Sequence, residues 1–485
     1  MFTFFAHTIL FYLIFESSVT WRKNKRGKSL LLIYMSEAVS NEDISLIIDK
    51  NQIIVKRKVA TKRPDDSFIS KARFTTSLPI VKASATDPNG VSFYVFIIRE
   101  GNLTHVDIDF SRNPHQPFVL KYLLQLIVHP SVIEKFGSLN ILNWPSENLT
   151  NIYIMPGLGN LFFTSSYSVV EKDKNGIIAL RPPGFIRNLT SHSMNASAIR
   201  LEWGYSSTTR LILKYSIKNT GRSPISNIIL NTYVPPTTIF QNVKYLFNMP
   251  IKVDEDHNSI VSIPINAIMP GRTEYIALVC DITPNGNMNC VIPNLGTFQS
   301  YRDILLQNRE TARFITDNNT WDFGEPTVQS LVRLLLNKAE NPTDYMKMAF
   351  EFVNQKIQYF INNRRDPASV ALKTLKGDCS EYSDLFVALL RGGGIPAKVV
   401  HGVIIDNAKN RIEPHAWCEY FSPELGWIQC DPTWGYLAGV CCQHISRQRE
   451  GLEIDLPTYS VSFTSTDSKL IVNEQVEFQI IPKEN

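Results

Sequence analysis

Residues 377–400 read GDCSEYSDLFVALLRGGGIPAKVV, and this stretch predicts a helix with both ends marked. One buried face follows from apolar residues at i, i+3, i+4, i+7 and i+8, namely Tyr382, Leu385, Phe386, Leu389 and Leu390. The glycines at 392–394 end the helix, and Pro396 prevents its continuation. Cys379 is therefore expected in the first turn, where unpaired amides and the helix dipole stabilise a thiolate. The same amides can receive the oxyanion of a tetrahedral intermediate.

A second stretch supplies a histidine and a carboxylate. Residues 413–436 read EPHAWCEYFSPELGWIQCDPTWGY, in which two strand-like runs are joined by a turn. A hairpin centred on Pro423 sets His415 opposite Asp431, and one centred on Glu424 moves the match by one step. Both registers leave the histidine and the aspartate on the same face of the sheet, because both have odd numbers. A carboxylate in that place can hold an imidazole in one tautomer.

Taken singly, a cysteine in an amphipathic helix or a histidine in a strand is usually a core residue. A thiolate–imidazolium pair forms only if three features occur together. The cysteine must begin a helix, the two strands must form a hairpin, and the histidine and aspartate must lie on the same face of it. The order Cys379, His415, Asp431, spaced by 36 and 16 residues, resembles that of the transglutaminase-like superfamily. The matching pieces are GDCSEYSDLFVALLRGGGIPAKVVHG, HAWCEYFSPELGWIQCDPTWG and the later His444-Ile445.

This resemblance covers roughly residues 340–450 and implies a papain-like fold. It assigns Cys379 as the nucleophile, His415 as general base and acid, and Asp431 as the residue that orients the imidazole. Tyr359 is the candidate for a further oxyanion donor, with packing as its alternative. Three tryptophans, Trp417, Trp427 and Trp434, would line the acyl groove or pack the sheet.

The chemistry that the resemblance implies is attack of a thiolate on an amide, which gives an acyl-thioester. Water as the acceptor makes a protease or deamidase, and a lysine amine makes a cross-linking transglutaminase. Microbial relatives with these motifs imply hydrolysis of a protein or peptide substrate, so a cysteine-nucleophile amide hydrolase is the favoured expectation. Protein-glutamine gamma-glutamyl transfer and a non-catalytic scaffold are the alternatives. The sequence contains no dense carboxylate loop of the calcium-binding type.

The remaining cysteines raise the question of zinc. Cys441-Cys442-x-His444, with Cys418 or Cys430, would supply four ligands. No C-x-x-C pair exists, and Cys418 and Cys430 alternate onto the face opposite the predicted triad. Burial as small hydrophobic residues is the favoured interpretation, so we expect neither a metal nor a cofactor.

The rest of the chain predicts a multidomain α+β protein. Residues 36–190, with a strand at 92–98 and a helix at 118–129, are expected to form an α+β domain of unknown role. Residues 191–300 carry alternating apolar residues and turn signals, which indicate an immunoglobulin-like β-sandwich that would dock partners. Residues 301–485 are assigned to the catalytic domain, with helices from about 326 and 343 and further strands at the end.

Composition and charge favour a globular protein over a nucleic-acid-binding or disulfide-stabilised one. The 485 residues are 44% hydrophobic and 19% charged, which predicts packed cores in about three domains. A net charge of +4 is too small to indicate a nucleic-acid partner. Seven cysteines are too few for a disulfide scaffold.

The amino-terminal segment, residues 1–35, has two interpretations. Its apolar run at 1–15 is shorter than the roughly 20 residues that cross a bilayer. The basic residues at 22–26 follow that run, the reverse of a signal peptide. One expectation is a true start at Met35 and a cytoplasmic protein. The alternative is a membrane anchor within residues 1–20 or an atypical export signal.

Overall fold

The computed structural model divides the chain into two compact units. Unit 1 comprises Met1–Glu134, Leu142–Gly159 and Ser166–Arg200, and unit 2 comprises Lys135–Ile141, Asn160–Ser165 and Leu201–Asn485. The structure describes residues 19–23, 29–33, 43–49, 52–62, 69–112, 119–144, 149–164, 169–172, 174–181, 199–205, 207–285, 292–361, 364–406, 409–452, 455–464 and 469–481. The apolar run at 1–15, the expected start at Met35 and Cys290 lie outside these residues. Within the described ranges, no helix has the length and apolarity to cross a membrane.

Unit 1 is built on a ten-stranded sheet. Its strand order is β14-β15-β12-β3-β4-β9-β6-β7-β8-β5. The strands are β3 (Asp43–Asp49), β4 (Gln52–Lys62), β5 (Lys71–Thr76), β6 (Ile80–Thr86), β7 (Ser92–Glu100), β8 (Leu103–Asp109), β9 (Val119–Val128), β12 (Leu149–Ile154), β14 (Val169–Lys172) and β15 (Ile178–Arg181). A separate hairpin joins β1 (Val19–Lys23) to β2 (Ser29–Ile33).

The helix expected at 118–129 is wrong, because this segment is strand β9. Its buried side chains alternate with less buried ones, at Leu120, Tyr122, Leu124, Leu126 and Val128. Leu123 and Ile127 also occupy two of the intervening positions, which hides the period of two in the sequence. The described residues of this region therefore form strands and one short 3-10 turn, η1 (Pro130–Val132), where an α+β domain was expected.

Unit 2 contains two four-stranded sheets with a common hydrophobic core. One has the order β19-β22-β17-β30 and the other β20-β21-β18-β29. Their strands are β17 (Thr208–Asn219), β18 (Ser226–Val234), β19 (Gln241–Tyr245), β20 (Ile251–Val253), β21 (Ser259–Ile265), β22 (Thr273–Pro284), β29 (Tyr459–Thr464) and β30 (Leu470–Ile481). A further four-stranded sheet orders β10 (Ile133–Phe136), β11 (Leu139–Trp144), β16 (Ile199–Gly204) and β13 (Asn160–Thr164).

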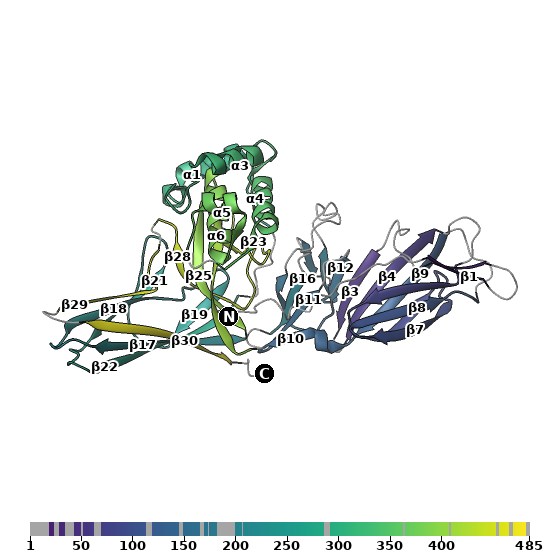
Figure 1. The fold of residues 1–485 in the computed structure, drawn as a ribbon, viewed down its shortest axis with the longest axis horizontal. Coiled ribbons are helices and arrows are strands. Elements are labelled where there is room, and N and C mark those ends of the chain that lie inside the picture. Colours follow the sequence, from purple (N-terminus) through teal and green to yellow (C-terminus); the bar gives the residue numbers. More distant parts are fainter. Residues whose placement is uncertain are drawn as a thin grey trace. The chain divides into compact units, whose positions relative to one another are not determined.

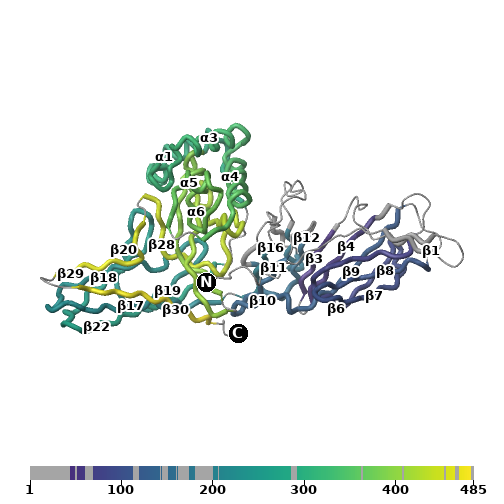
Figure 2. The backbone as a smooth tube through the Cα atoms, in the orientation of Figure 1, coloured from purple at the N-terminus to yellow at the C-terminus, as the bar shows by residue number. Residues whose placement is uncertain are grey.

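The carboxyl-terminal strands belong to this pair of sheets, although we expected them with the catalytic segment. β30 pairs with β17 from Thr208↔Ile481 to Asn219↔Leu470, and β29 pairs with β18. In Figures 1 and 2 the two yellow strands run beside the teal β17 and β18. The boundary at residue 300 missed this pairing, because sequence order does not show which strand a distant segment joins.

The last part of unit 2 combines helices with a four-stranded sheet of order β27-β26-β25-β28. The predicted helices begin where expected, at Pro326 and Pro342. The elements are α1 (Phe298–Gln307), α2 (Arg309–Ala312), α3 (Pro326–Leu336), α4 (Pro342–Lys356), β23 (Gln358–Tyr359), α5 (Ala368–Thr374), β24 (Lys376–Gly377), α6 (Cys379–Gly392), β25 (Ala397–Asp406), β26 (Arg411–Ser422), β27 (Gly426–Cys430) and β28 (His444–Glu450). Helices α3, α4 and α5 pack around α6, which also contacts β25 and β26 (Figure 1). The whole is a mixed α/β, strand-rich protein with several sheets.

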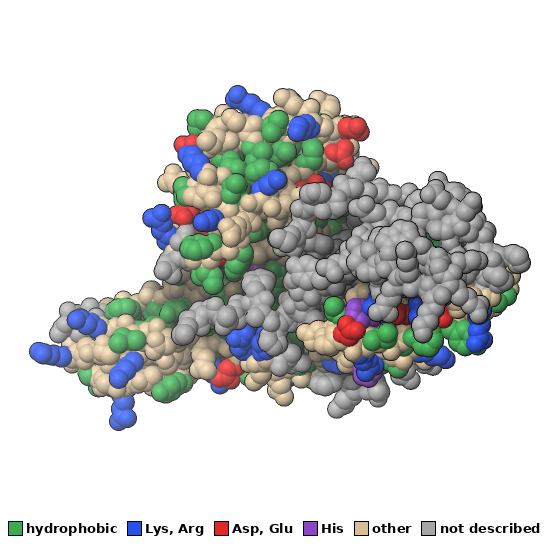
Figure 3. All heavy atoms as spheres, turned by 45° about the vertical axis from the view of Figure 1, so that its right-hand side comes forward, with side chains coloured by type: hydrophobic (Ala, Val, Ile, Leu, Met, Phe, Trp, Pro, Cys, Tyr) green, Lys and Arg blue, Asp and Glu red, His purple; other side chains and the backbone are tan. Residues whose placement is uncertain are grey.

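The surface carries charge of both signs. On the face drawn in Figure 3, the described Lys and Arg side chains are scattered among apolar and acidic ones and do not gather in one patch. This distribution agrees with the net charge of only +4.

Removal of β30 should destabilise unit 2. The β30 side chains Val472, Val476, Phe478 and Ile480 pack against the common core, and their loss exposes apolar surface. We expect a chain ending at Lys469 to melt at a clearly lower temperature than one ending at Ile481, measured by circular dichroism. Equal melting temperatures would contradict the assignment of β30 to this pair of sheets.

Candidate active site

The start of α6 places Cys379 at its first helical position. Asp378 is the N-cap, and its Oδ1 accepts a hydrogen bond of 2.9 Å from the Ser380 amide. Glu381 completes a capping box, because its Oε2 accepts a 2.8 Å bond from the Asp378 amide. The helix start is therefore fixed by its own sequence, and Cys379 is partly exposed there.

The cap also changes the expectation for an oxyanion site. The Asp378 side chain accepts hydrogen bonds from the amides of both Ser380 and Glu381. These two amides are thus occupied, although the sequence suggested that the whole first turn was open. The amide of Cys379 itself is not among the bonds to Asp378, which makes it the better oxyanion donor of the first turn.

His415 and Asp431 meet as the hairpin predicted. The β26–β27 ladder runs from Cys418↔Cys430 to Ser422↔Gly426, the register centred on Glu424. His415 Nε2 donates a 2.8 Å hydrogen bond to Asp431 Oδ2, and the two side chains are 8% and 0% exposed. The Cys379 side chain lies close enough to His415 to raise the pKa of its imidazole. Asp431 occupies Nε2 of that ring.

Burial and charge oppose one another at this pair. Burial disfavours both charged forms, but the mutual attraction outweighs it. The pKa of His415 rises to about 10, with the Cys379 contact adding to the effect of Asp431. The pKa of Asp431 falls far below its usual value, through its contacts with His415 and His444. At neutral pH the pair is an imidazolium and a carboxylate.

The body of α6 lies on the opposite face of the sheet from His415. Cys418 Sγ donates to Ser383 O on α6 over 3.5 Å, and Cys418 is three positions from His415 along β26. Ala416, Cys418 and Tyr420 join the core around α6, whereas Trp417 stacks on the His415 ring. The first residue of α6 thus meets the imidazole, while the rest of the helix covers the face of β26 that carries the even-numbered residues.

Asp431 has more partners than the sequence indicated. Its Oδ1 accepts bonds from the amides of Thr433 and Trp434, at 2.8 and 3.0 Å. Its Oδ2 accepts a second imidazole, His444 Nε2, at 3.1 Å. Sequence reasoning noted His444 only as part of a family match or a zinc motif. The contact of His444 with Asp431 could not be predicted from the neighbouring sequence, because β27 ends at Cys430 and β28 begins only at His444.

The predicted aromatic residues separate into two groups. Trp417 and Trp434 flank His415, with ring centroids 5.9 and 5.7 Å from the imidazole. Trp427 packs elsewhere, under the ammonium of Lys398 at 3.9 Å. Tyr359 is 41% exposed on β23, which pairs with β24 just before Cys379. Burial of its hydroxyl, and then the neighbouring charge of Cys379, raise the pKa of Tyr359.

Three potential metal ligands converge here. Among the described residues, only His415, Asp431 and His444 bring three donor atoms within 4.8 Å of one another. Both imidazoles direct Nε2 at one carboxylate oxygen over hydrogen-bond distances, so at least one ring would have to turn to bind an ion. Cys418 and Cys430 lie in the core around α6, on the other face of the sheet from His415. The four-ligand zinc set considered from the sequence is not assembled.

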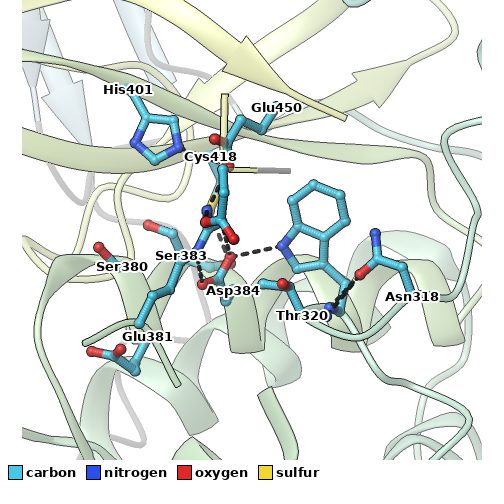
Figure 4. Close-up of polar contacts among 12 residues, drawn as sticks. Asn318, Thr320, Ser380, Glu381, Ser383, Asp384, His401, Cys418 and Glu450 are labelled. Atoms are coloured by element: carbon cyan, nitrogen blue, oxygen red, sulfur yellow. Dashed lines mark hydrogen bonds and ion pairs between the residues drawn. The ribbon is translucent and has the colours of Figure 1, made fainter. Parts of the chain in front are cut away.

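A buried ionic cluster ties α6 to β28. Arg365 donates two hydrogen bonds of 2.7 Å to the carboxylate of Asp384, and one of 2.6 Å to Glu450 Oε2. The Trp321 indole donates to Asp384 as well, at 2.7 Å. Figure 4 shows Asp384 at the centre of these dashed contacts, next to Ser383 and Cys418, with Glu450 and His401 nearby. The cluster fixes the helix that carries Cys379 against the strand that carries His444.

The comparisons with known proteins concern the part of the chain that carries this site. Residues 329–432 match the model of the Transglutaminase-like superfamily. The chain contains a transglutaminase-like domain. It is 39% identical over 69 residues to the Protein-glutamine gamma-glutamyltransferase of Pseudomonas aeruginosa, which is 13% of this chain and 10% of that protein. It is 27% identical over 115 residues to the Uncharacterized protein YebA of Bacillus subtilis, 21% of this chain and 16% of that one. The transglutaminase-like domain thus aligns with only a small part of these relatives' length.

Two solved structures are also similar. A candidate cysteine protease from Cytophaga hutchinsonii has a TM-score of 0.38 and 14% identity, over 57% of this chain and 99% of that chain. The periplasmic domain of TgpA from Pseudomonas aeruginosa, bound to ethylmercury, has a TM-score of 0.28 and 15% identity, over 62% and 91%.

Substitution of Arg365 should destabilise the transglutaminase-like domain. Arg365→Leu leaves the fully buried Asp384 carboxylate without its ionic partner, which costs about 3–5 kcal/mol. Arg364→Leu is the matched control, because the Arg364 side chain is 79% exposed. Chemical denaturation of the two variants checks the difference. Equal unfolding free energies would show that the cluster does not hold α6.

Proposed function

We propose that this protein is a cysteine-nucleophile amide hydrolase that acts on a protein or peptide through an acyl-thioester. The observation that carries the proposal is the His415 Nε2–Asp431 Oδ2 hydrogen bond of 2.8 Å, on an imidazole that also contacts Cys379. Cys379 occupies the first position of α6, where its own amide can face the oxyanion of an attacked carbonyl. The transglutaminase-like domain supports the same class of chemistry.

The proposed reaction has two halves. Cys379 Sγ attacks the carbonyl carbon of the scissile amide, and the Cys379 amide stabilises the oxyanion. The His415 imidazolium gives its proton to the leaving amine as the C–N bond breaks, which leaves the acyl-thioester. His415, now neutral, takes a proton from water as the water attacks the thioester, and the acid product leaves with the thiolate restored. Asp431 stays ionised throughout and orients the ring.

Transfer to an amine is the second candidate, because one relative is named a Protein-glutamine gamma-glutamyltransferase. A transferase must keep water from its thioester until the amine arrives. The partial exposure of Cys379 at the start of α6 favours water as the acceptor. Hydrolysis is therefore the first choice.

We also propose that the two-sheet part of unit 2 is an immunoglobulin-like module that docks the substrate or a partner protein. Its support is the pair of four-stranded sheets around one core.

Selective alkylation tests the nucleophile. Cys379 is partly exposed, while the other described cysteines, Cys280, Cys418, Cys430, Cys441 and Cys442, are buried. Iodoacetamide at neutral pH should modify Cys379 first, as located by peptide mass spectrometry. Cys379→Ala should abolish amide cleavage and leave the melting temperature nearly unchanged. The control is Cys280→Ala, in the sandwich core, which should cleave normally. Near-normal cleavage by Cys379→Ala would sink the assignment.

The pH dependence follows from His415. Its pKa is raised from the ordinary 6.5 to about 10, so the ring keeps its proton at neutral pH and loses it only as the pH rises through about 10. The acid needed for the leaving amine is lost over the same range. We expect kcat/KM to stay high through neutral pH and to fall near pH 10. A fall centred near pH 6.5 would show that Asp431 does not hold the imidazolium.

A competition assay separates the two acceptors. A glutamine-containing peptide is incubated with the protein and a millimolar biotinylated primary amine, and both products are followed by mass spectrometry. We expect hydrolysis to exceed amine incorporation. Faster incorporation would make the protein a transglutaminase, and the absence of both, with Cys379 unlabelled, would favour a scaffold.

A further inference from the structure

His444 lies across the Asp431 carboxylate from His415. Both Nε2 atoms contact the same oxygen, Oδ2, at 2.8 Å for His415 and 3.1 Å for His444. On its other side, His444 Nδ1 is 3.1 Å from Cys441 Sγ. We infer that Cys441 and His444 form a second thiol–imidazole pair on Asp431, called here the second arm. In this pair His444 is a positioning residue: it donates to the same oxygen, Oδ2, as His415, and so weakens the hold of that oxygen on the His415 imidazolium. This inference rests on the proposed function.

The donor and acceptor roles in the second arm follow from its neighbours. The His444 and His415 ring centroids are 5.7 Å apart, and both rings face the same carboxylate oxygen. That oxygen only accepts, so His444 Nε2 carries a hydrogen. Its Nε2–H donates to Asp431, which leaves Nδ1 as an acceptor for the Cys441 S–H. The thiol thereby fixes one tautomer of His444.

The two arms differ in access. Cys379 is partly exposed, whereas Cys441 is 2% exposed and the His444 side chain is 0% exposed. The second arm therefore cannot receive a substrate carbonyl. The His444 ring is enclosed by Trp417 and Trp434, at 5.1 and 5.0 Å. An apolar ring would fill such a space equally well, and the polar contacts with Asp431 and Cys441 give a histidine there its reason.

The effect on His415 has a definite sign. A carboxylate oxygen that accepts two N–H groups is less basic than one that accepts a single group. Loss of the His444 donor would concentrate the charge of Oδ2 on His415, and the imidazolium would hold its proton more tightly. A tighter proton makes a weaker general acid for the leaving amine. If His444 only supported the fold, its loss would instead loosen the contact between Asp431 and His415, and the pKa of His415 would fall.

Other titratable groups face His444 as well. Asp431 follows β27, His415 lies on β26, and Cys441 precedes β28. The Tyr436 ring is 6.1 Å away, and Glu202 of β16 lines the same small cavity of about 30 Å³ as His444 and Cys441. The pH dependence of kcat/KM therefore reports on His415, and nitrogen-15 NMR reports on His444.

Variants of the 485-residue chain separate the effect of losing the His444 N–H donor from the effect of changing the size of its side chain. His444→Phe keeps an aromatic ring and removes the donor, and His444→Gln retains an N–H group. Cys441→Ser keeps a donor to Nδ1, and Cys441→Ala removes it. Cys442→Ala is the matched control, because the neighbouring Cys442 side chain lies in the core shared with the β-sandwich. Melting temperatures show which variants fold.

We expect His444→Phe to lower kcat roughly tenfold at pH 7 with KM unchanged, and to move the basic limb of kcat/KM up by about one pH unit. His444→Gln and Cys441→Ser should recover most of kcat, Cys441→Ala should be intermediate, and Cys442→Ala should match the wild type. A basic limb that stays in place or moves down in a folded His444→Phe variant would overturn the inference.

Nitrogen-15 NMR of histidine-labelled protein gives a readout that needs no substrate. We expect His444 at pH 7 to be neutral with its proton on Nε2, and its Nδ1 shift to change in Cys441→Ala but not in Cys442→Ala. A cationic His444, or a proton on Nδ1, would overturn the inference. If wild-type Cys379 resists iodoacetamide while the NMR result holds, the proposed function fails and the second arm remains.

Discussion

The site depends on one buried carboxylate. Asp431 is fully enclosed, and an ionised group in such a place is tolerable only when its oxygens are paired. Two backbone amides take Oδ1 and two imidazoles take Oδ2. These four donors come from β26, from β28 and from the turn after β27. The carboxylate thus orders three segments of the sheet at once, and the orientation of His415 is a consequence.

Cys379, the proposed nucleophile, is held by a different set of contacts. The capping box of Asp378 and Glu381 fixes where α6 begins, and therefore where Cys379 lies. Arg365 binds α6 to β28 through Asp384 and Glu450. Since β28 also carries His444, the helix and the carboxylate share a supporting strand. The thiol and the imidazole belong to separate elements, and these two buried ionic centres set the geometry between them.

How much of this could be read from the sequence depends on how local each signal was. The start of α6 follows from a helical period with marked ends, and the meeting of His415 with Asp431 follows from the parity of a short hairpin. The partners of β29 and β30 lie more than two hundred residues away, so no local pattern reported them. In β9, apolar residues on both faces concealed the strand period. His444 was visible as a motif residue, but its contact with Asp431 depends on how β28 pairs with β25.

The most direct test of the account is the reactivity of the Cys379 thiol with and without the Asp431 charge. The rate of Cys379 alkylation by iodoacetamide at neutral pH would be measured, together with amide turnover, in the wild type and in Asp431→Asn. The wild type should be alkylated faster, because Asp431 holds the His415 imidazolium that contacts Cys379. In Asp431→Asn alkylation should slow, with turnover lower by about 10⁴. An unchanged alkylation rate and turnover above about a tenth of normal would contradict the central role given to Asp431.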